Sequence, residues 1–346
     1  MRNSFFNGFI VLVLLLVSCK TINSPTTKTS LYPYVEDNQV GFLDTNLTRQ
    51  ISAQFSFLNN RLWPYQFSEG LAAVNFLGTV GYIDSNGNIA IEPQFDYGKP
   101  FKNGIALVQE GGHFGFINRS GNYIIKPKFY NAYSFSEGLA AVQKRRNGNW
   151  GYITSDGDHP IPLQFNAAKS FSEGLALVQT STHNEWGYIN KEGETVIEPT
   201  YDQAKSFSEG LAPVQLNYKQ WGYINRNGAV IIASKYLEAE PFSEGKAAVA
   251  MPQDKNNLDK KKYGFINKRG EFIIEPRFDK AFSFRDGVAR IKVDNKFGFV
   301  DAQGNMIAEP IYDHAWNFQS GMAMVKLGNK YGYINKQGIF VLEPLS

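Results

Sequence analysis

A unit of about 35 residues recurs along almost the whole chain of 346 residues, and this repeat strongly limits its possible folds. Each copy centres on a glycine that follows an aromatic residue or valine and precedes a second aromatic residue, and neighbouring copies are 34 to 42 residues apart. The nine glycines are Gly41, Gly81, Gly115, Gly151, Gly187, Gly222, Gly264, Gly298 and Gly332. Such a period predicts a row of small units that bury their apolar faces against each other, because one unit alone cannot do so.

Every unit contains three short runs of strand-forming residues. In one clear copy these are Leu175–Val178, Trp186–Ile189 and Thr195–Ile197. Between the second and third runs lies Asn190–Gly193, which is typical of a tight hairpin turn because Asn and Gly tolerate positive φ. Pro199 then ends the third run, since proline has no N–H to donate. We therefore expect each repeat to be a three-stranded antiparallel meander.

The sequence leaves two arrangements of these meanders open. We favour an all-β, open and twisted β-solenoid of tandem repeats, and the alternative is a closed β-propeller. A propeller blade usually has four strands in about 40 residues or more, whereas this unit has three runs in about 35. Both ends of the array also carry a complete aromatic-glycine hairpin, at Gly41 and Gly332, so they do not supply complementary parts of one blade.

At these residues the chain resembles the WG-repeat (KWG) family, which is found in many bacterial proteins. The matching segments are Trp150–Ile153, Trp186–Ile189 and Trp221–Ile224, together with Phe-Ser-Glu-Gly-Leu-Ala elements that begin at Phe135, Phe171 and Phe207. Other copies keep a ring in place of the tryptophan, at Phe114, Tyr263, Phe297 and Tyr331. The resemblance implies a repeating β structure and brings no catalytic residues with it, because the family is defined by its scaffold.

The N-terminus has the features of a signal peptide. Arg2 precedes the apolar run Phe9–Val17, which is too short to span a bilayer core of about 30 Å. The next residues, Leu16–Cys19, resemble the lipobox of bacterial lipoproteins, and Cys19 is the only cysteine. We expect a signal peptide over residues 1–18, a lipidated Cys19 with a flexible tether over residues 19–39, and the repeat domain of about eight repeats over residues 40–346.

Lipidation would anchor the protein in the bacterial cell envelope. Lys20 follows the cysteine in the place where an aspartate commonly retains lipoproteins at the inner membrane, so we expect the outer membrane. Which face of that membrane carries the domain is left open.

The sequence contains no pattern that indicates catalysis or metal binding. Hydrophobic residues make up 43% of the chain and charged residues 19%, with 35 basic against 32 acidic residues, which argues against disorder and against nucleic-acid binding. A single cysteine excludes an intrachain disulfide framework and a cysteine-rich zinc site. The four histidines, His113, His159, His183 and His314, are solitary. We therefore expect no catalytic residue, no metal and no cofactor, and we leave the oligomeric state open.

Two acidic patterns invite a functional interpretation. Asp84–Asn88 is similar to the start of a calcium loop, but the twelfth position holds Phe95 where a glutamate is needed, so we interpret the segment as a hairpin turn. A series of acids also recurs in the Ser-Glu-Gly elements, where it could mimic a row of catalytic groups. In other repeats a turn-forming residue replaces the glutamate, which favours a structural role for this position. This series is Glu69, Glu137, Glu173, Glu209 and Glu244, with Asn103, Asp286 and Ser320 in the other copies.

One charge asymmetry remains. The loops before the anchor glycines hold twelve basic residues against five acidic ones. Stacked repeats would place these loops on one edge, called the basic edge below, which makes it a candidate binding face, although hairpin tips are also simply solvated. The basic edge comprises Lys144, Arg145, Arg146, Lys219, Lys255, Lys260, Lys261, Lys262, Lys292, Lys296, Lys326 and Lys330.

These observations together predict a cell-envelope lipoprotein whose β-repeat array is a binding or scaffold module. Its partner would be an envelope protein, a polysaccharide or a host molecule, including an anionic one, and not a nucleic acid. The alternatives are an envelope hydrolase acting on glycans and a purely structural spacer.

Overall fold

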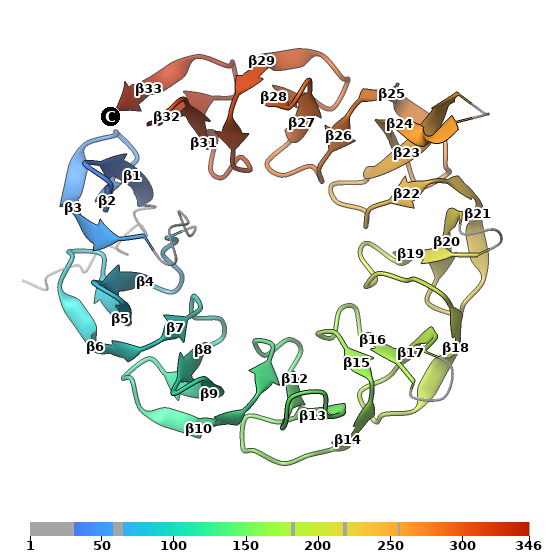
Figure 1. Cartoon of the computed structure of the whole chain (residues 1–346), viewed down its shortest axis with the longest axis horizontal. Coiled ribbons are helices and arrows are strands. Elements are labelled where there is room, and N and C mark those ends of the chain that lie inside the picture. Colours follow the sequence, from blue (N-terminus) through green and yellow to red (C-terminus); the bar gives the residue numbers. More distant parts are fainter. Residues whose placement is uncertain (1–30, 58–64, 181–183, 217–219, 255–256, 346) are drawn as a thin grey trace, which may run out of the picture.

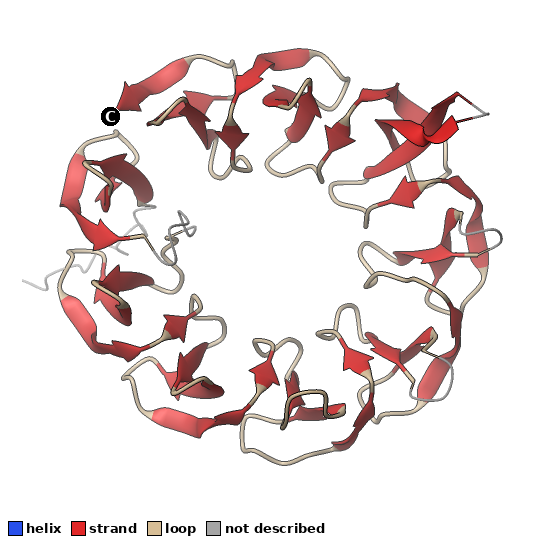
Figure 2. Cartoon of the chain, in the orientation of Figure 1, coloured by secondary structure: helices blue, strands red, loops and turns tan. Residues whose placement is uncertain are grey.

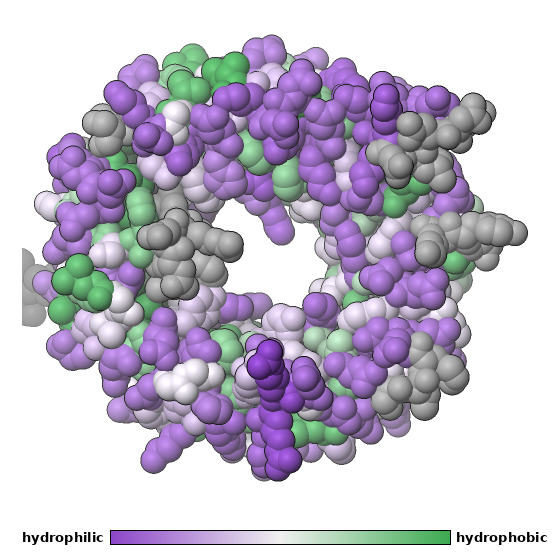
Figure 3. Space-filling view, viewed as in Figure 1, coloured by the Kyte–Doolittle hydropathy of each residue, from purple (hydrophilic) through white to green (hydrophobic). Residues whose placement is uncertain are grey.

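The computed structural model describes residues 31–57, 65–180, 184–216, 220–254 and 257–345. Within these ranges the chain forms strands and loops and no helix (Figure 2). The strands make nine antiparallel sheets that follow one another in sequence order around a ring. Figure 1 shows this ring of nine blades, and the space-filling view in Figure 3 shows that its centre is open.

Blades 1 to 5 occupy the first half of the ring. Their strands are β1 (Tyr32–Glu36), β2 (Gln39–Leu43) and β3 (Arg49–Ser56) in blade 1; β4 (Leu71–Phe76), β5 (Thr79–Asp84) and β6 (Ile89–Phe95) in blade 2; β7 (Tyr97–Gly98), β8 (Ile105–Glu110), β9 (His113–Asn118) and β10 (Tyr123–Phe129) in blade 3; β11 (Asn131–Ala132), β12 (Ala140–Gln143), β13 (Trp150–Ile153) and β14 (Ile161–Phe165) in blade 4; and β15 (Ala167–Ala168), β16 (Ala176–Gln179), β17 (Trp186–Ile189) and β18 (Thr195–Tyr201) in blade 5.

Blades 6 to 9 complete it. Their strands are β19 (Leu211–Gln215), β20 (Trp221–Asn225) and β21 (Val230–Tyr236) in blade 6; β22 (Glu238–Ala239), β23 (Ala247–Asp254), β24 (Asn257–Ile266) and β25 (Phe272–Phe278) in blade 7; β26 (Lys280–Ala281), β27 (Ala289–Val293), β28 (Lys296–Val300) and β29 (Met306–Tyr312) in blade 8; and β30 (His314–Ala315), β31 (Met322–Leu327), β32 (Lys330–Asn335) and β33 (Phe340–Leu345) in blade 9.

A complete blade has four strands, which we call a, b, c and d in chain order, as in β7, β8, β9 and β10. The three runs expected from the sequence are strands b, c and d. Strand a is a further strand of only two residues, found in six of the nine sheets. Because two residues carry no periodicity, strand a has no signature in the sequence, and the three-stranded meander is an incomplete description.

The anchor glycine of each repeat lies in strand c where strand d crosses it closely. A Cβ atom on Gly187 would lie 2.6 Å from the Ile197 carbonyl oxygen and 2.7 Å from the Pro199 nitrogen. The pairing register also shifts here, between Trp186 and Tyr188. Only glycine leaves room for this contact, which explains why the aromatic-glycine pair and the later proline recur together.

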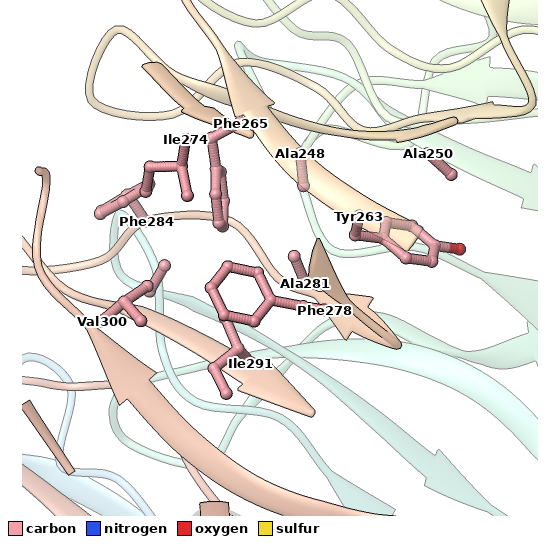
Figure 4. Packing of buried hydrophobic residues seen from close by; sticks show 11 residues of the cluster. Ala248, Ala250, Tyr263, Phe265, Ile274, Phe278, Ala281, Phe284, Ile291 and Val300 are labelled. Atoms are coloured by element: carbon pink, nitrogen blue, oxygen red, sulfur yellow. The ribbon is translucent and has the colours of Figure 1, made fainter. Parts of the chain in front are cut away.

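The hydrophobic core lies mainly between neighbouring blades. Between blades 7 and 8, Phe284 lies beside Phe265 with ring centroids 4.8 Å apart, and Ile274 and Val300 pack around them (Figure 4). Aromatic side chains at the corresponding positions form the same kind of contact at other interfaces between blades. Each blade therefore depends on its neighbours for burial of its apolar residues.

The ring closes between the two ends of the array. Blade 1 packs against blade 9, where the rings of Tyr32 and Tyr333 meet at 6.0 Å and 74°. The preference for an open solenoid was therefore wrong, and the closed β-propeller that we kept as the alternative is the observed fold. Closure needs no blade shared between the two ends, because the last sheet packs directly against the first.

The lead-in before the first clear repeat forms a sheet of three described strands. Strand β1, Tyr32–Glu36, lies within the range expected as tether, and its residues Tyr32, Tyr34 and Val35 are buried. Cys19 and residues 1–18, expected as lipid-carrying cysteine and signal peptide, lie outside the described residues. In the described ranges, no helix has the length and apolar character needed to cross a membrane.

Candidate functional site

The Ser-Glu-Gly hairpins join strands a and b and face the central opening (Figure 1). Their acidic residue adopts positive φ, for example 57° at Glu173 and 55° at Glu209, and the following glycine does so too. This left-handed turn costs free energy at a non-glycine residue, so a compensating interaction is expected.

That interaction comes from the next blade. The Glu173 carboxylate accepts a 2.9 Å hydrogen bond from the backbone N–H of Gly210, and Glu209 accepts one of the same length from Gly245. A basic side chain from the c–d turn of that next blade also approaches, as in the 3.3 Å pair of Arg226 with Glu173. The same amide contact links Glu69 to Gly104, Glu137 to Gly174, Glu244 to Gly287 and Asp286 to Gly321.

These contacts confirm a structural role for the acidic series. Each carboxylate joins its own hairpin to the hairpin of the following blade, a partner 35 to 43 residues away in sequence. The sequence indicated a turn residue but not the partner, because a bond between repeats has no local pattern. The Asp84 segment is likewise a hairpin turn, in which the backbone N–H groups of Asn86 and Asn88 donate to the Asp84 carboxylate.

The basic edge lies on the b–c hairpins, as expected, but many of its cations are already paired. Lys262 binds Asp279 at 2.7 Å, Lys296 binds Asp313 at 2.6 Å, and Lys261 binds Glu238. Lys292 and Lys326 each lie over an aromatic ring, while Lys260 and Lys330 are exposed. Lys219 and Lys255 lie outside the described residues.

The neutralising acids come from the junction between strand d of one blade and strand a of the next. Asp313 pairs with Lys296 of blade 8 and also accepts a 2.6 Å hydrogen bond from the backbone N–H of Gly328 in blade 9. Asp279 makes the corresponding contacts at the preceding junction, with Lys262 of blade 7 and the backbone N–H of Asp294 in blade 8. The sequence count of loop charges missed these acids, because strands a and d lie outside the loops that it compared.

Blade 4 departs from this pattern. Its b–c loop carries Lys144, Arg145 and Arg146, all exposed, and the junctions on its two sides hold Tyr130 and Asn166 in place of aspartate. The three cations form no ion pair with the described residues. Figure 3 shows a strongly hydrophilic cluster over the region of β12 and β13. This region of the basic edge is thus free to attract an anion.

An aromatic groove of about 310 Å³ lies between blades 3 and 4. The rings of Tyr133 and Trp150 lie 5.4 Å apart with a 35° tilt, and Tyr97 meets Phe114 edge-on at 6.5 Å. Gln109, Asn131 and Lys99 add polar groups to the lining. Aromatic surfaces with a few amides and a cation are typical of sites that bind small organic or sugar-like ligands.

A second pocket of about 420 Å³ is lined by residues of the same two blades. Lys128, Lys144 and His159 give it a basic character beside Phe129 and Leu163. Partial burial, followed by the charges of Lys128 and Lys144, lowers the pKa of the His159 imidazole. The b–c loop connects the two hollows, since Lys144 at its start lines this pocket and Trp150, just after it, lines the aromatic groove.

The other sequence candidates are scattered. His113, His159 and His314 lie in different blades, and His183 lies outside the described residues. No group of three His, Cys, Asp or Glu side chains in the described ranges of the chain is placed to hold a metal ion.

The fold places the protein in the class of closed β-propellers, here with nine blades. Similar solved structures include the crystal structure of the eukaryotic initiation factor, with a TM-score of 0.65 and 9% identity over 92% of this chain and 96% of that one. The computationally designed Ika8 protein has a TM-score of 0.47 and 10% identity over 78% of this chain and 94% of that one. At such identities the first likeness shows the fold alone.

The sequence comparison then gives the family. The WG containing repeat matches over residues 81–112, 114–148, 150–181, 186–219, 221–251, 263–297 and 297–331, which is more than half of the chain. The chain therefore belongs to the WG containing repeat family, as the sequence resemblance indicated. A search among curated proteins found no match.

Proposed function

We propose that this protein is a lipid-anchored cell-envelope protein whose propeller binds an anionic polysaccharide across blades 3 and 4. The repeat β-array itself suggests a binding or scaffold module. The observation that carries the finer proposal is the combination of the aromatic groove with the cations of blade 4 that no junction aspartate neutralises.

Each region of the surface suits a different feature of such a ligand. The apolar faces of sugar rings stack on aromatic side chains such as Tyr133 and Trp150, and sugar hydroxyls bond to amides such as those of Gln109 and Asn131. Arg145 and Arg146 can bind carboxylate or phosphate groups in a bidentate manner. A chain that follows the b–c loop would meet both surfaces.

The binding test uses the purified protein with polygalacturonate as the anionic probe and dextran as the neutral one. Replacing Lys144, Arg145 and Arg146 together by Gln should weaken polygalacturonate binding at least tenfold. The matched control replaces three cations of the same edge, Lys292, Lys296 and Lys326, by Gln, and should change it less than twofold. Equal losses in the two triple variants would contradict a specific site on blade 4.

A separate variant tests whether the aromatic groove takes part in binding. Trp150→Leu, checked for an unchanged melting curve, should weaken polygalacturonate binding about fivefold while leaving binding to polyglutamate, an anion without sugar rings, unchanged. If polyglutamate binds as tightly as polygalacturonate to the wild type, the surface selects charge alone and the glycan proposal fails. Binding should also weaken steeply with salt, because exposed charges are screened over about 8 Å at physiological ionic strength.

The lipid anchor rests on the sequence pattern around Cys19, which supports lipidation at an outer membrane. Cells fed a clickable fatty acid should label the wild-type protein and not Cys19→Ala. Equal labelling of both proteins would overturn the anchor and leave the proposed binding surface untouched.

A further inference from the structure

Strand d lies on the outside of the ring (Figure 1), and at three interfaces an aromatic side chain at its start contacts the preceding blade. This ring meets, edge-on, the ring that ends strand d of the blade before. The centroids lie 6.2 to 6.4 Å apart at angles of 81° to 90°, a favourable geometry for aromatic pairs. The three pairs are Tyr123 with Phe95, Phe272 with Tyr236, and Phe340 with Tyr312.

The interface of blades 2 and 3 shows how such a ring is held. The ring of Tyr123 lies against Phe95. Its hydroxyl donates a hydrogen bond to the carboxylate of Glu110, at the end of strand b in the same blade. The outer side of this interface is therefore occupied by a phenol whose polar end meets an acid.

The next interface, between blades 3 and 4, keeps only half of this arrangement. Phe129 ends strand d of blade 3 as Phe95 ends that of blade 2. By strand register and by the hydrogen bonds of the c–d turn, however, His159 stands in the place of Tyr123. The imidazole is smaller than the phenol, and a groove of about 420 Å³ lies here, the second pocket of these two blades. Its lining residues are Lys128, Phe129, Lys144, His159, Pro162 and Leu163.

A second interface without the aromatic ring also has a hollow. Between blades 5 and 6 the same position holds Val230, and a hollow of about 370 Å³ lies beside Tyr201, the counterpart of Phe129. The described residues that line it include no charged side chain. Loss of the ring thus opens a hollow between blades, and the surrounding side chains decide what it can bind.

The groove between blades 3 and 4 is basic. Lys144 stands where blade 3 has Glu110, and Lys128 stands where blade 2 has a neutral amide. Neither lysine forms an ion pair with a described residue, and none of the described residues in the lining is acidic. Partial burial and then the charges of the two lysines lower the pKa of the His159 imidazole, whereas the adjacent Asp158 has a smaller, opposite effect. Three basic groups therefore surround the position that a ring occupies in blade 3.

We propose that this groove binds a small molecule that carries a phosphate group on an aromatic ring. The ring would lie edge-on against Phe129, as Tyr123 lies against Phe95. The phosphate would meet Lys144 in the place where the tyrosine hydroxyl meets Glu110. A phosphate suits these basic groups because it carries about −1.5 to −2 charges at pH 7 and three acceptor oxygens. This inference does not rest on the proposed glycan surface, with which the groove shares Lys144.

The probe is phenyl phosphate, with inorganic phosphate as the anion without a ring and phenol as the ring without the anion. Titrations of the full chain, followed by ligand-observed NMR, should show saturable binding of phenyl phosphate that is at least tenfold tighter than that of either control. If inorganic phosphate binds as tightly as phenyl phosphate, or if phenyl phosphate does not bind, the proposal is overturned.

A double variant can rebuild the arrangement of blade 3 inside the groove. His159→Tyr combined with Lys144→Glu restores the ring and its acid, and should abolish phenyl phosphate binding without lowering the melting temperature. The matched control makes the same two changes in the neutral hollow of blades 5 and 6, Val230→Tyr with Leu216→Glu, and should alter binding less than twofold. Equal losses in the two double variants would place the ligand elsewhere and overturn the proposal.

Removal of single charges separates the groove from the glycan surface. Lys128→Gln should weaken phenyl phosphate binding at least fivefold and, at an exposed position, should leave the melting curve unchanged. Arg145→Gln combined with Arg146→Gln should change this binding less than twofold while it weakens polygalacturonate binding. If the arginine variant loses phenyl phosphate as strongly as Lys128→Gln does, the ligand follows the overall charge of the basic edge and the groove is not its site. A lack of polygalacturonate binding would overturn the glycan proposal alone.

Discussion

The hydroxyl of Tyr333 in the last blade donates a 2.7 Å hydrogen bond to the carbonyl oxygen of Pro33 in the first, 300 residues earlier in the chain. The corresponding tyrosine of blade 5, Tyr188, makes a 2.8 Å bond of the same kind to Lys205 of blade 6. Burial, together with the nearby Tyr32, raises the pKa of Tyr333, which keeps its hydroxyl protonated as a donor. The two ends of the array are thus joined by a tyrosine hydroxyl, as neighbouring blades are, although the acceptor Pro33 lies in a b strand and Lys205 lies before the Ser-Glu-Gly hairpin.

We expect this closing contact to stabilise the protein as much as an internal one. Tyr333→Phe should lower the free energy of unfolding by about 1 kcal/mol, the usual contribution of one hydrogen bond. Tyr333→Ala should cost about 3–5 kcal/mol, because it also removes a buried ring. Denaturant unfolding measures both, with Tyr188→Phe and Tyr188→Ala as internal controls. A Tyr333→Ala protein as stable as wild type, beside a destabilised Tyr188→Ala, would mean that the ring is open in solution.

The anchor glycine should tolerate no side chain. Gly187→Ala brings a Cβ to 2.6 Å from the Ile197 carbonyl oxygen, so strand d must move, and we expect a loss of about 3 kcal/mol. Gly157 has a φ of 88°, and a Cβ added there would have no atom within 4 Å, so Gly157→Ala should cost only about 1 kcal/mol from backbone strain. Thermal and denaturant melts of the two variants check this. Equal losses would mean that backbone conformation, rather than the close approach of strand d, selects the glycine.

Much of this fold was predictable from the sequence because its signals are local. The hairpin turn at Asn190–Gly193 and the period of about 35 residues indicated strands b, c and d in the correct order. The expectation that Pro199 ends strand d was wrong, because this proline lies inside β18, in the irregularly paired stretch beside Gly187. Ring closure was not predictable in this way. It depends on the small rotation between successive blades, and the pair Tyr32 and Tyr333 has no signature in either segment alone.

The candidate site was only partly predictable. The sequence correctly placed the cations on the b–c hairpins, yet it could not show that Asp279 and Asp313 reach them from the d–a junctions. The aromatic groove was equally hidden, because Tyr133 and Trp150 belong to different runs of the repeat. The sequence does contain a signal for the unpaired cations of blade 4. Tyr130 and Asn166 stand at its two junctions, where Asp279 and Asp313 stand in later repeats.

The acidic hairpin residue should matter for stability through its partner in the next blade. Glu173→Ala removes the 2.9 Å bond to the Gly210 amide and the pair with Arg226, and should cost about 1–2 kcal/mol. Glu173→Gly loses the same contacts but relieves the positive φ, so it should cost less than the alanine variant. Glu192→Ala, at an exposed turn position, is the control and should stay within about 0.5 kcal/mol. Denaturant unfolding gives the ranking, and an alanine variant no less stable than the glycine variant would contradict it.

Glu238 at the junction of blades 6 and 7 should make stability depend on pH. Burial opposes its charge, but hydrogen bonds from Lys261, Tyr263 and Lys280 outweigh burial and hold the pKa of this carboxyl at about 2, below its ordinary 4.5. A carboxyl with a lowered pKa in the folded state stabilises the fold fully above its unfolded value, and this contribution is lost as pH falls from about 4.5 toward 2.

The variant Glu238→Gln should therefore be less stable than wild type at pH 7, by about 1 kcal/mol once solvent screening of this partly exposed group is allowed for. The difference should shrink steadily as the pH is lowered from 5 to about 3, because the wild type then loses the same contribution by protonation. Denaturant unfolding at a series of pH values measures this difference. Glu275→Gln, at an exposed position on strand β25 of the same blade, should show no such convergence. If the difference in the free energy of unfolding between wild type and Glu238→Gln stays constant down to pH 3, Glu238 stabilises blade 7 through packing rather than through its charge.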